Sequence, residues 1–272
     1  MGREFARPPE GPLVPATEKD YDLSIVIPVY KEAAKLPADI EAAFAFIATD
    51  RLTAEVIVVD DGSPDDTAAV ARSFRARFPE LRVLSYTPNR GKGHALRYGI
   101  ARARGRNILF ADAGLCVPYS IARIGLAMLD MRMCDIAHGS RRMRGTVTLQ
   151  QPLYRRVGSR LFGIIVHAFM GVPLYISDTQ CGFKAYRRDV AHRLFGAAFT
   201  DGFMFDTEII MRALAERYTI LEFPVIWRND ADTRFDPRRG SVRLLRELLA
   251  IRIGLLRKTR RAVPAAVVER EA

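Results

Sequence analysis

The chain has 272 residues, of which 49% are hydrophobic and 27% are charged, a composition typical of folded proteins that excludes an intrinsically disordered chain. The formal net charge is +11, which favours an anionic partner such as a phosphorylated substrate, an acidic membrane face or a nucleic acid. Nucleic acid is the least favoured, because no aromatic side chains alternate with the arginines. Three widely spaced cysteines predict no disulfide framework and a cytoplasmic location.

The first half of the chain alternates apolar strands with helical stretches. Residues 1–20 are rich in proline and mixed in charge, so they are predicted to be a disordered lead-in. The predicted strands are Leu23–Ile27, Glu55–Val59, Arg82–Ser85 and Asn107–Ala111. The predicted helices are Pro37–Ala48, Asp65–Arg77 and Gly93–Arg104. This alternation predicts an α/β fold, with a doubly wound, mostly parallel sheet and helices on both faces.

Two adjacent carboxylates, Asp60 and Asp61, follow the second predicted strand and precede Gly62. Residues Val56–Val59 are all β-branched, which is typical of a strand buried on both faces. Ligands of parallel sheets bind outside the carboxyl ends of the strands, where acidic side chains suit the donor groups of a nucleobase or ribose. The alternative is a helix cap by Asp61 or Ser63, which explains one polar residue but not the whole run.

A basic segment, Asn89–Gly93, follows the third predicted strand and precedes a helix. Backbone amides at a helix N-terminus, together with Lys92, predict contact with phosphate groups. The segment has neither the glycine and lysine spacing of a P-loop nor the glycine pattern of a dinucleotide fold. It therefore points to a phosphate site of another kind.

The second half of the chain is less regular. The remaining predicted elements are a strand at Asp135–His138, a Gly- and Arg-rich loop at Gly139–Gln151, a helix at Tyr154–Met170, a helix at Phe205–Arg217 and a strand at Thr219–Phe223. The longest apolar run, Leu161–Ile176, is shorter than the roughly 20 residues of a spanning helix, so no transmembrane segment is predicted. No linker interrupts residues 21–240, which are expected to form one domain.

Residues 241–261 have the pattern of a basic amphipathic helix, followed by a tail at 262–272. The apolar side chains at helical spacing are Val242, Leu245, Leu249, Ile253 and Leu256, with Leu248 beside them. Arginines fill most of the opposite face. Such a helix either lies on a membrane surface or packs on the body of the protein with its basic face in solvent, and the pattern leaves both possibilities open.

Taken together, the motifs resemble those of glycosyltransferase family 2, the inverting sugar-nucleotide transferases of the GT-A fold. The matching stretches are Pro28–Glu32, Asp60–Ser63, Asn89–Gly93, Gly139–Arg141, Arg155 with Ser159, Ser177–Lys184, Gly202–Glu208, and Trp227 with Gly240 and Ser241. The later stretches look like the polyprenyl-phosphate branch of the family. The string Asp178–Lys184 looks most like that of the dolichyl-phosphate glucosyltransferases.

The resemblance implies a role for each matching residue. Pro28, Tyr30, Glu32, Asp60, Asp61 and Gly62 would surround the base and ribose of a nucleotide sugar, with Lys92 and Lys184 near its phosphates. Arg141, Arg155 and Ser159 would hold a polyprenyl phosphate acceptor. The expected donor is UDP-glucose, with GDP-mannose next. The protein would act as a peripheral enzyme on the cytoplasmic (inner) face of a membrane, without binding nucleic acid.

The sequence departs from the family pattern at the metal motif. The family has Asp-x-Asp after the fourth strand, whereas this chain reads Asp112-Ala113-Gly114. Because Mg²⁺ and Mn²⁺ often take one or two carboxylates plus substrate phosphate, Asp112 alone is expected to hold the metal. The alternatives are a transferase with a non-lipid acceptor and a metal-defective, non-catalytic relative that binds nucleotide sugars. The set of Arg141, Arg155 and Ser159 favours a catalyst.

Overall fold

The computed structural model of the chain describes residues 21–149, 153–228, 244 and 246–255, and within them the side chains of residues 148–161 lie outside the description. The predicted lead-in, the tail and part of the predicted C-terminal helix fall outside these ranges. So do Gly240 and Ser241.

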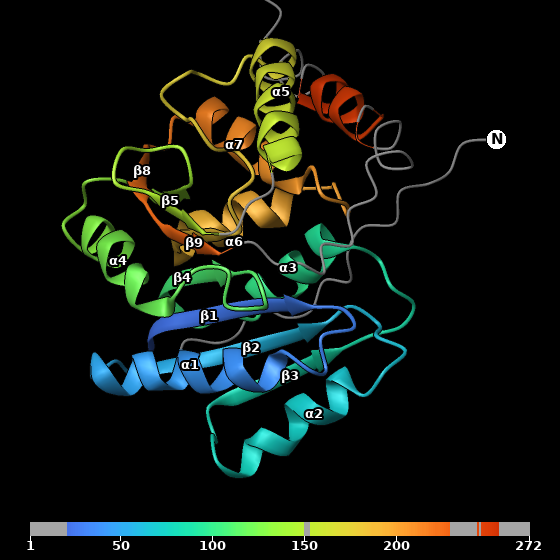
Figure 1. Cartoon of the computed structure of the whole chain (residues 1–272), viewed down its shortest axis with the longest axis vertical. Helices are drawn as coiled ribbons and strands as arrows, with labels where there is room; N and C mark the ends of the chain where they lie inside the picture. Colours follow the sequence, from blue (N-terminus) through green and yellow to red (C-terminus); the bar gives the residue numbers. More distant parts are fainter. Residues whose placement is uncertain (1–20, 150–152, 229–243, 245, 256–272) are drawn as a thin grey trace, which may run out of the picture.

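A seven-stranded sheet forms the centre of the molecule (Figure 1). Its strands, in spatial order, are β3 (Leu81–Ser85), β2 (Ala54–Asp60), β1 (Tyr21–Val29), β4 (Gly105–Ala111), β7 (Phe183–Arg187), β5 (Ile136–Ser140) and β8 (Ile220–Pro224). All neighbouring pairs are parallel except those of β7, which runs antiparallel to both β4 and β5. The predicted α/β fold with a mostly parallel sheet is confirmed.

Helices cover both faces of this sheet, as predicted. They are α1 (Leu36–Thr49), α2 (Thr67–Ser73), α3 (Lys92–Ile100), α4 (Ala122–Asp130), α5 (Leu153–Met170), α6 (Arg188–Ala197) and α7 (Phe205–Ala215). Single turns of 3-10 helix, η1 (Phe74–Ala76) and η2 (Tyr119–Ile121), follow α2 and precede α4. Successive strand residues point to opposite faces, so Ile25 packs in the core under α1 and α4 while Val26 packs in the core under α3, α6 and α7.

Several short elements were not predicted from the sequence. They are β7, α4, α6 and a separate parallel pair formed by β6 (Val147–Leu149) and β9 (Ile226–Arg228). The sequence of β7, Phe-Lys-Ala-Tyr-Arg, carries lysine at a position that the fold buries completely. A charged residue in a five-residue stretch obscures the apolar signal of a central strand, so the sequence pattern predicts no strand there.

The C-terminal helical residues, 246–255, pack on the body of the protein through one face. Leu248 and Ile251 are buried, and the Arg252 guanidinium donates to the Phe169 carbonyl at the end of α5. Leu249 and Ile253, which belong to the predicted apolar stripe, remain 51% and 41% exposed. The helix thus packs on the protein and still presents apolar side chains to its surroundings. No helix in the described part of the chain is long and apolar enough to cross a membrane.

Candidate active site

The carboxyl ends of β1, β2 and β4 meet at one edge of the sheet, and most of the predicted donor residues follow directly after them. Pro28 lies near the end of β1, opposite Val59 of β2. The pairing of β1 with β4 ends at Val26 and Phe110, two residues earlier. A proline is therefore accommodated in this central strand without the loss of a bond to β4.

The loops after β1 and β2 are joined by hydrogen bonds. The Lys31 amide donates to the Ser63 hydroxyl over 2.9 Å, and the Glu32 amide donates to the Thr67 hydroxyl over the same distance. Lys31 has a φ of 57°, which turns the chain sharply beside Tyr30. The two loops form one connected rim at the donor edge.

Asp61 organises the segment that precedes α3. Its buried carboxylate accepts hydrogen bonds from the Tyr86 hydroxyl (2.8 Å), the Asn89 side chain (2.8 Å), and the amides of Arg90 (2.7 Å) and Gly91 (2.8 Å). Burial and the contact with Asp61 raise the pKa of Tyr86, so this phenol stays protonated as a donor. Asp61, predicted to contact the nucleotide, is thus engaged by its own chain.

Asp60 and Gly62 lie on either side of Asp61 in the chain. Asp60 accepts a hydrogen bond from the Ser63 amide at 3.2 Å and is 4% exposed. Gly62 has a φ of 69°, and a Cβ there would lie 2.8 Å from the Asn89 backbone nitrogen. Only glycine fits this turn, because both the backbone angle and the close approach exclude a side chain.

The backbone amides at the start of α3 are already engaged inside the protein. Those of Arg90 and Gly91 donate to Asp61, and those of Gly93 and His94 donate to the Asp201 carbonyl at 2.9 and 3.3 Å. The sequence predicts that amides of this segment contact phosphate. These four are satisfied by protein groups instead, and the group that the segment directs toward Asp112 is the side-chain ammonium of Lys92.

Lys92 and Asp112 form an ion pair at the centre of the edge. The Lys92 Nζ lies 2.5 Å from Asp112 Oδ1, and it sits over the rings of Phe110 and Phe205. Burial lowers the pKa of Lys92, but the carboxylates of Asp112 and Asp206 outweigh burial and leave the pKa above its ordinary value. The lysine is therefore charged at neutral pH.

The loop that carries Asp112 is fixed at two points. The Asp112 amide donates to the Gly182 carbonyl at 2.8 Å, and a Cβ at Gly182 would collide with the Asp112 carboxylate. Downstream, the buried Asp39 of α1 accepts hydrogen bonds from the amides of Gly114 (2.7 Å) and Leu115 (2.9 Å). These contacts fix the backbone on both sides of Asp112 and leave its carboxylate little freedom to move.

A divalent cation fits this site only when a bound diphosphate supplies some of the oxygens that coordinate it. Gly114, at the position of the second carboxylate in the family motif, has a φ of 90°. Within the described ranges, no group of three or more His, Cys, Asp or Glu side chains converges to hold a metal. Asp112 offers one oxygen-rich ligand at the open edge, which suffices for Mg²⁺ or Mn²⁺ when a diphosphate supplies further oxygens.

Lys184 lies deeper than a phosphate-binding lysine is expected to lie. It is 1% exposed, is paired with Asp206 of α7 and donates to the Thr179 carbonyl. Burial raises the pKa of Asp206, and the positive charges of Lys184 and Lys92 oppose that rise. Two lysines and two carboxylates thus form a chain of alternating charge, with Asp112 at its open end.

On the other side of β7, Arg141 and Asp178 form a bidentate ion pair. Arg141 Nε and Nη2 donate to Asp178 at 2.7 and 2.8 Å, and the guanidinium lies over the ring of Trp227, 5.4 Å from its centroid. Burial raises the pKa of Asp178, but the charge and hydrogen bonds of Arg141 outweigh burial and leave this pKa far below its ordinary value. Glu222 accepts from the Asp178 amide at 2.8 Å. The predicted acceptor cation is thereby held in one orientation.

Arg155 and Ser159 lie in the first half of α5, and their side chains fall outside the described residues. Two positioning carboxylates, Asp39 and Asp178, were not predicted from the sequence. Asp39 gave no usable signal, since an acidic residue in the first turn of a helix is explained by the helix dipole alone. Asp178 stood in a matching motif, but its pairing with Arg141 depends on the fold.

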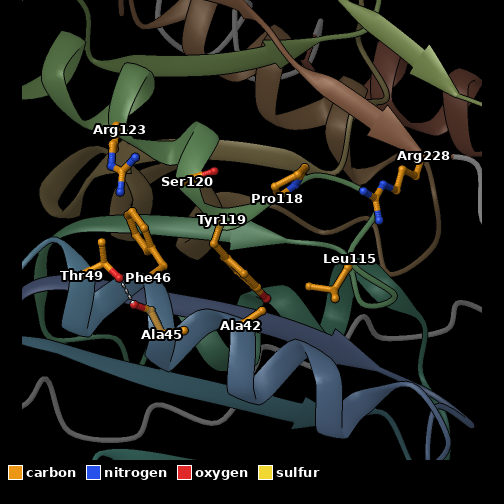
Figure 2. A pocket seen from close by; sticks show the side chains of 10 residues that line it. All are labelled: Ala42, Ala45, Phe46, Thr49, Leu115, Pro118, Tyr119, Ser120, Arg123 and Arg228. Atoms are coloured by element: carbon orange, nitrogen blue, oxygen red, sulfur yellow. Dashed lines mark hydrogen bonds between the residues drawn. The ribbon is translucent and has the colours of Figure 1, made fainter.

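A cavity of about 390 Å³ lies behind the Asp112 loop, between α1 and η2 (Figure 2). Its walls are Ala42, Ala45, Phe46, Thr49, Leu115, Pro118, Tyr119, Ser120, Arg123 and Arg228. The Tyr119 hydroxyl is buried there without a hydrogen-bond partner in the described part of the chain. None of the predicted donor or acceptor residues lines this cavity, so it is separate from the candidate site.

Comparisons with known proteins agree with this geometry. Residues 24–195 match the model of the family "Glycosyl transferase family 2". The chain is 33% identical over 243 residues to a dolichyl-phosphate beta-glucosyltransferase of Drosophila melanogaster, covering 85% of this chain and 74% of the relative. The Homo sapiens protein of the same name is 31% identical over 246 residues, at 86% and 76% coverage. A Mycobacterium tuberculosis glucosyl-3-phosphoglycerate synthase, crystallised with Mn²⁺, UDP and glucosyl-3-phosphoglycerate, superimposes with a TM-score of 0.62 at 19% identity, covering 90% of this chain and 82% of that one.

Proposed function

This chain belongs to glycosyl transferase family 2 and has the GT-A fold, and from that premise we propose that it transfers a hexose from a nucleotide sugar to a polyprenyl or dolichyl phosphate. The proposed donor is UDP-glucose, with GDP-mannose next. One observation carries the proposal. The short segment Asp178–Gly182 contacts both the proposed acceptor side and the proposed donor side of the site. Asp178 holds Arg141 on the acceptor side, and the Gly182 carbonyl holds the backbone of Asp112 on the donor side. Relatives with the acceptor in their names support the choice of lipid.

In the proposed reaction an oxygen of the acceptor phosphate attacks the anomeric carbon. The bond from that carbon to the donor diphosphate breaks, its electron pair leaves with the nucleoside diphosphate, and the anomeric configuration inverts. The acceptor phosphate is already an anion, so no proton has to be removed from it. The protein's task is positioning: cationic side chains hold the two anions in line. We assign Arg141, Arg155 and Ser159 to the acceptor phosphate.

On the donor side, Pro28, Tyr30, Glu32, Asp60 and Gly62 form the rim that we assign to the base and ribose. Asp61 shapes that rim from inside. Lys92 is the proposed contact to the diphosphate, and Lys184 supports it through the buried carboxylate of Asp206. Asp112 would hold Mg²⁺ or Mn²⁺ together with the diphosphate. Such a cation neutralises charge on the leaving group.

The decisive test is product formation from labelled UDP-glucose, GDP-mannose and UDP-N-acetylglucosamine, each with a polyprenyl phosphate. Transfer from UDP-glucose is expected, and EDTA should abolish it. Arg141→Ala should lower kcat/KM for the lipid phosphate about 100-fold or more, because it removes a charge-assisted bond to the nucleophile. Arg144→Ala is the matched control, since Arg144 is exposed in the same loop, and its activity should stay within about twofold.

The affinity for UDP, measured by calorimetry, separates the two sides of the site. Arg141→Ala should leave it unchanged. An equal loss of UDP affinity would assign Arg141 to the donor, and transfer only to a non-lipid sugar acceptor would refute the proposed acceptor.

We also propose that the protein meets its lipid substrate at the cytoplasmic membrane surface through the helix at 246–255. Leu249 and Ile253 are the supporting observation, because they are exposed apolar side chains on a helix that also carries Arg246 and Arg252. An amphipathic helix of this composition binds anionic lipid surfaces.

A further inference from the structure

The ion pair between Lys92 and Asp112 occupies the carboxylate to which the metal is assigned. The two side chains are 23% and 31% exposed, although Asp112 Oδ1 itself is buried, so a ligand arriving at the edge of the sheet can contact both side chains. The ammonium is also held over the rings of Phe110 and Phe205, at 5.2 and 5.8 Å from their centroids. The negative charge of Asp112 is therefore neutralised by a cation of the chain itself.

The other carboxylates nearby do not replace Asp112 as metal ligands, because they are engaged with groups of the protein. Asp39 is committed to the amides of Gly114 and Leu115, and Asp206 is paired with the buried Lys184. Gly114 brings no second carboxylate to the loop. A divalent cation that approaches alone thus meets one carboxylate and one ammonium 2.5 Å apart, and the ammonium repels it.

A diphosphate changes this balance. The amides of Arg90, Gly91, Gly93 and His94 are engaged inside the protein, whereas the ammonium of Lys92 lies beside Asp112 as a side-chain cation that can turn to phosphate. Phosphate oxygens carry more negative charge than one carboxylate, and they attract the ammonium away from Asp112. The freed carboxylate and the diphosphate then offer oxygens to the same cation.

We propose that Lys92 closes Asp112 to divalent cations until a nucleoside diphosphate binds, so that metal and donor enter the site together. The inference rests on the proposed function for the identity of the donor, but not on the acceptor. By thermodynamic reciprocity, the nucleotide raises the affinity for the metal by the same factor as the metal raises the affinity for the nucleotide. Lys92 contributes part of that factor, and the direct contact between metal and phosphate contributes the rest.

The test is a titration of Mn²⁺ into the nucleotide-free protein, followed by the electron paramagnetic resonance signal of free Mn²⁺. Wild type should bind Mn²⁺ alone weakly and at least tenfold more tightly in the presence of UDP. Lys92→Met keeps an apolar stem over the two rings and removes the charge. It should bind Mn²⁺ alone at least tenfold more tightly than wild type, and UDP should improve its affinity by a smaller factor.

Two further variants make the result specific. Lys92→Arg keeps a cation beside Asp112 and should stay closed to Mn²⁺, as wild type is. The double variant Lys92→Met with Asp112→Asn should lose the gain, since the gained affinity belongs to Asp112. Circular dichroism checks that each variant is folded.

The proposal is overturned if Lys92→Met binds Mn²⁺ alone no better than wild type, or if wild type binds Mn²⁺ equally well with and without UDP. These measurements need no turnover. A failed transfer assay with an intact Mn²⁺ result would refute the proposed acceptor and leave this inference standing.

Discussion

At the scale of single residues, the loop of Asp112 favours glycine at position 114, where the family motif has its second carboxylate. Gly114 has a φ of 90°, and its amide is bound by Asp39. A residue with a side chain is strained at this angle by about 1–3 kcal/mol. Restoring the second carboxylate by substitution alone is therefore expected to damage the loop.

We predict that Gly114→Asp lowers the free energy of unfolding by about 1–3 kcal/mol and does not increase activity. The measurement is urea unfolding combined with the transfer assay. Gly145→Asp is a matched control, because Gly145 also has a φ of 90° but lies in an open loop with only Pro224 within 4 Å. It should lose similar stability and keep its activity. Tighter Mn²⁺ binding with full stability in Gly114→Asp would contradict this account.

The residue types of the site could be predicted from the sequence better than their partners could. The positions of the acidic residues at the end of β2 and of the basic segment before α3 were predicted, because strand ends and helix starts carry local signals, while their roles stay predictions. Lys184 was assigned to phosphate, yet strand alternation in β7 turns it inward to Asp206. Local patterns do not reveal such pairings, since the partner is 22 residues away in the chain.

At the scale of elements, Glu55 of β2 connects the amino ends of neighbouring strands. Its buried carboxylate accepts from the Ser24 hydroxyl of β1 (2.8 Å), the Arg82 guanidinium of β3 (2.9 Å) and the Arg104 amide before β4 (2.8 Å). Burial raises the pKa of Glu55, but the hydrogen bonds from Arg82, Ser24 and Arg104 outweigh burial and leave the pKa below its ordinary value.

We predict that Glu55→Gln lowers the free energy of unfolding by about 2 kcal/mol at neutral pH. Because the folded pKa is depressed, this stabilisation is complete above the unfolded pKa of about 4.3 and is lost as the pH falls through the folded pKa. The difference between wild type and variant in urea unfolding should therefore shrink from pH 7 to about pH 3. Glu41→Gln, which removes an exposed ion pair with Arg77, should have a small effect. A difference independent of pH would disprove the role of ionisation.

The order of elements was predictable only where it followed the chain. The strands and helices from β1 to β4 obey the alternation of an α/β sheet, and each was anticipated. The insertion of β7 between β4 and β5 was not, because an antiparallel strand out of chain order is determined by long-range pairing. This insertion is what brings Gly182 to Asp112 and Asp178 to Arg141.

At the scale of the whole molecule, the net charge of +11 and the exposed apolar side chains of the C-terminal helix are both expected to favour an anionic lipid surface. We predict that the protein cosediments with anionic vesicles, and that moderate salt weakens this without abolishing it. Salt screens charge beyond about 10 Å at 0.1 M but leaves apolar insertion intact. Leu249→Glu with Ile253→Glu should reduce vesicle binding at least fivefold.

The matched control for this prediction is Met131→Glu with Met133→Glu. Both methionines are exposed apolar residues, 72% and 54%, in the turn after α4. The control adds the same negative charge and should bind vesicles within about twofold of wild type. Unchanged binding by the helix variant would place the membrane contact elsewhere. The next candidates are Leu174 and Tyr175, which are 83% and 64% exposed just before the Ser177–Lys184 motif.

The contact between Arg141 and Trp227 gives the protein a built-in optical reporter. Trp227 is the single tryptophan of the chain, so all indole emission comes from this one position. A guanidinium over an indole ring is held partly by the electrostatics of the ring, and an anion that draws on the same guanidinium alters the field at the ring. Because we assign Arg141 to the acceptor phosphate, we expect the intrinsic fluorescence to change when that phosphate binds, without a label and without turnover.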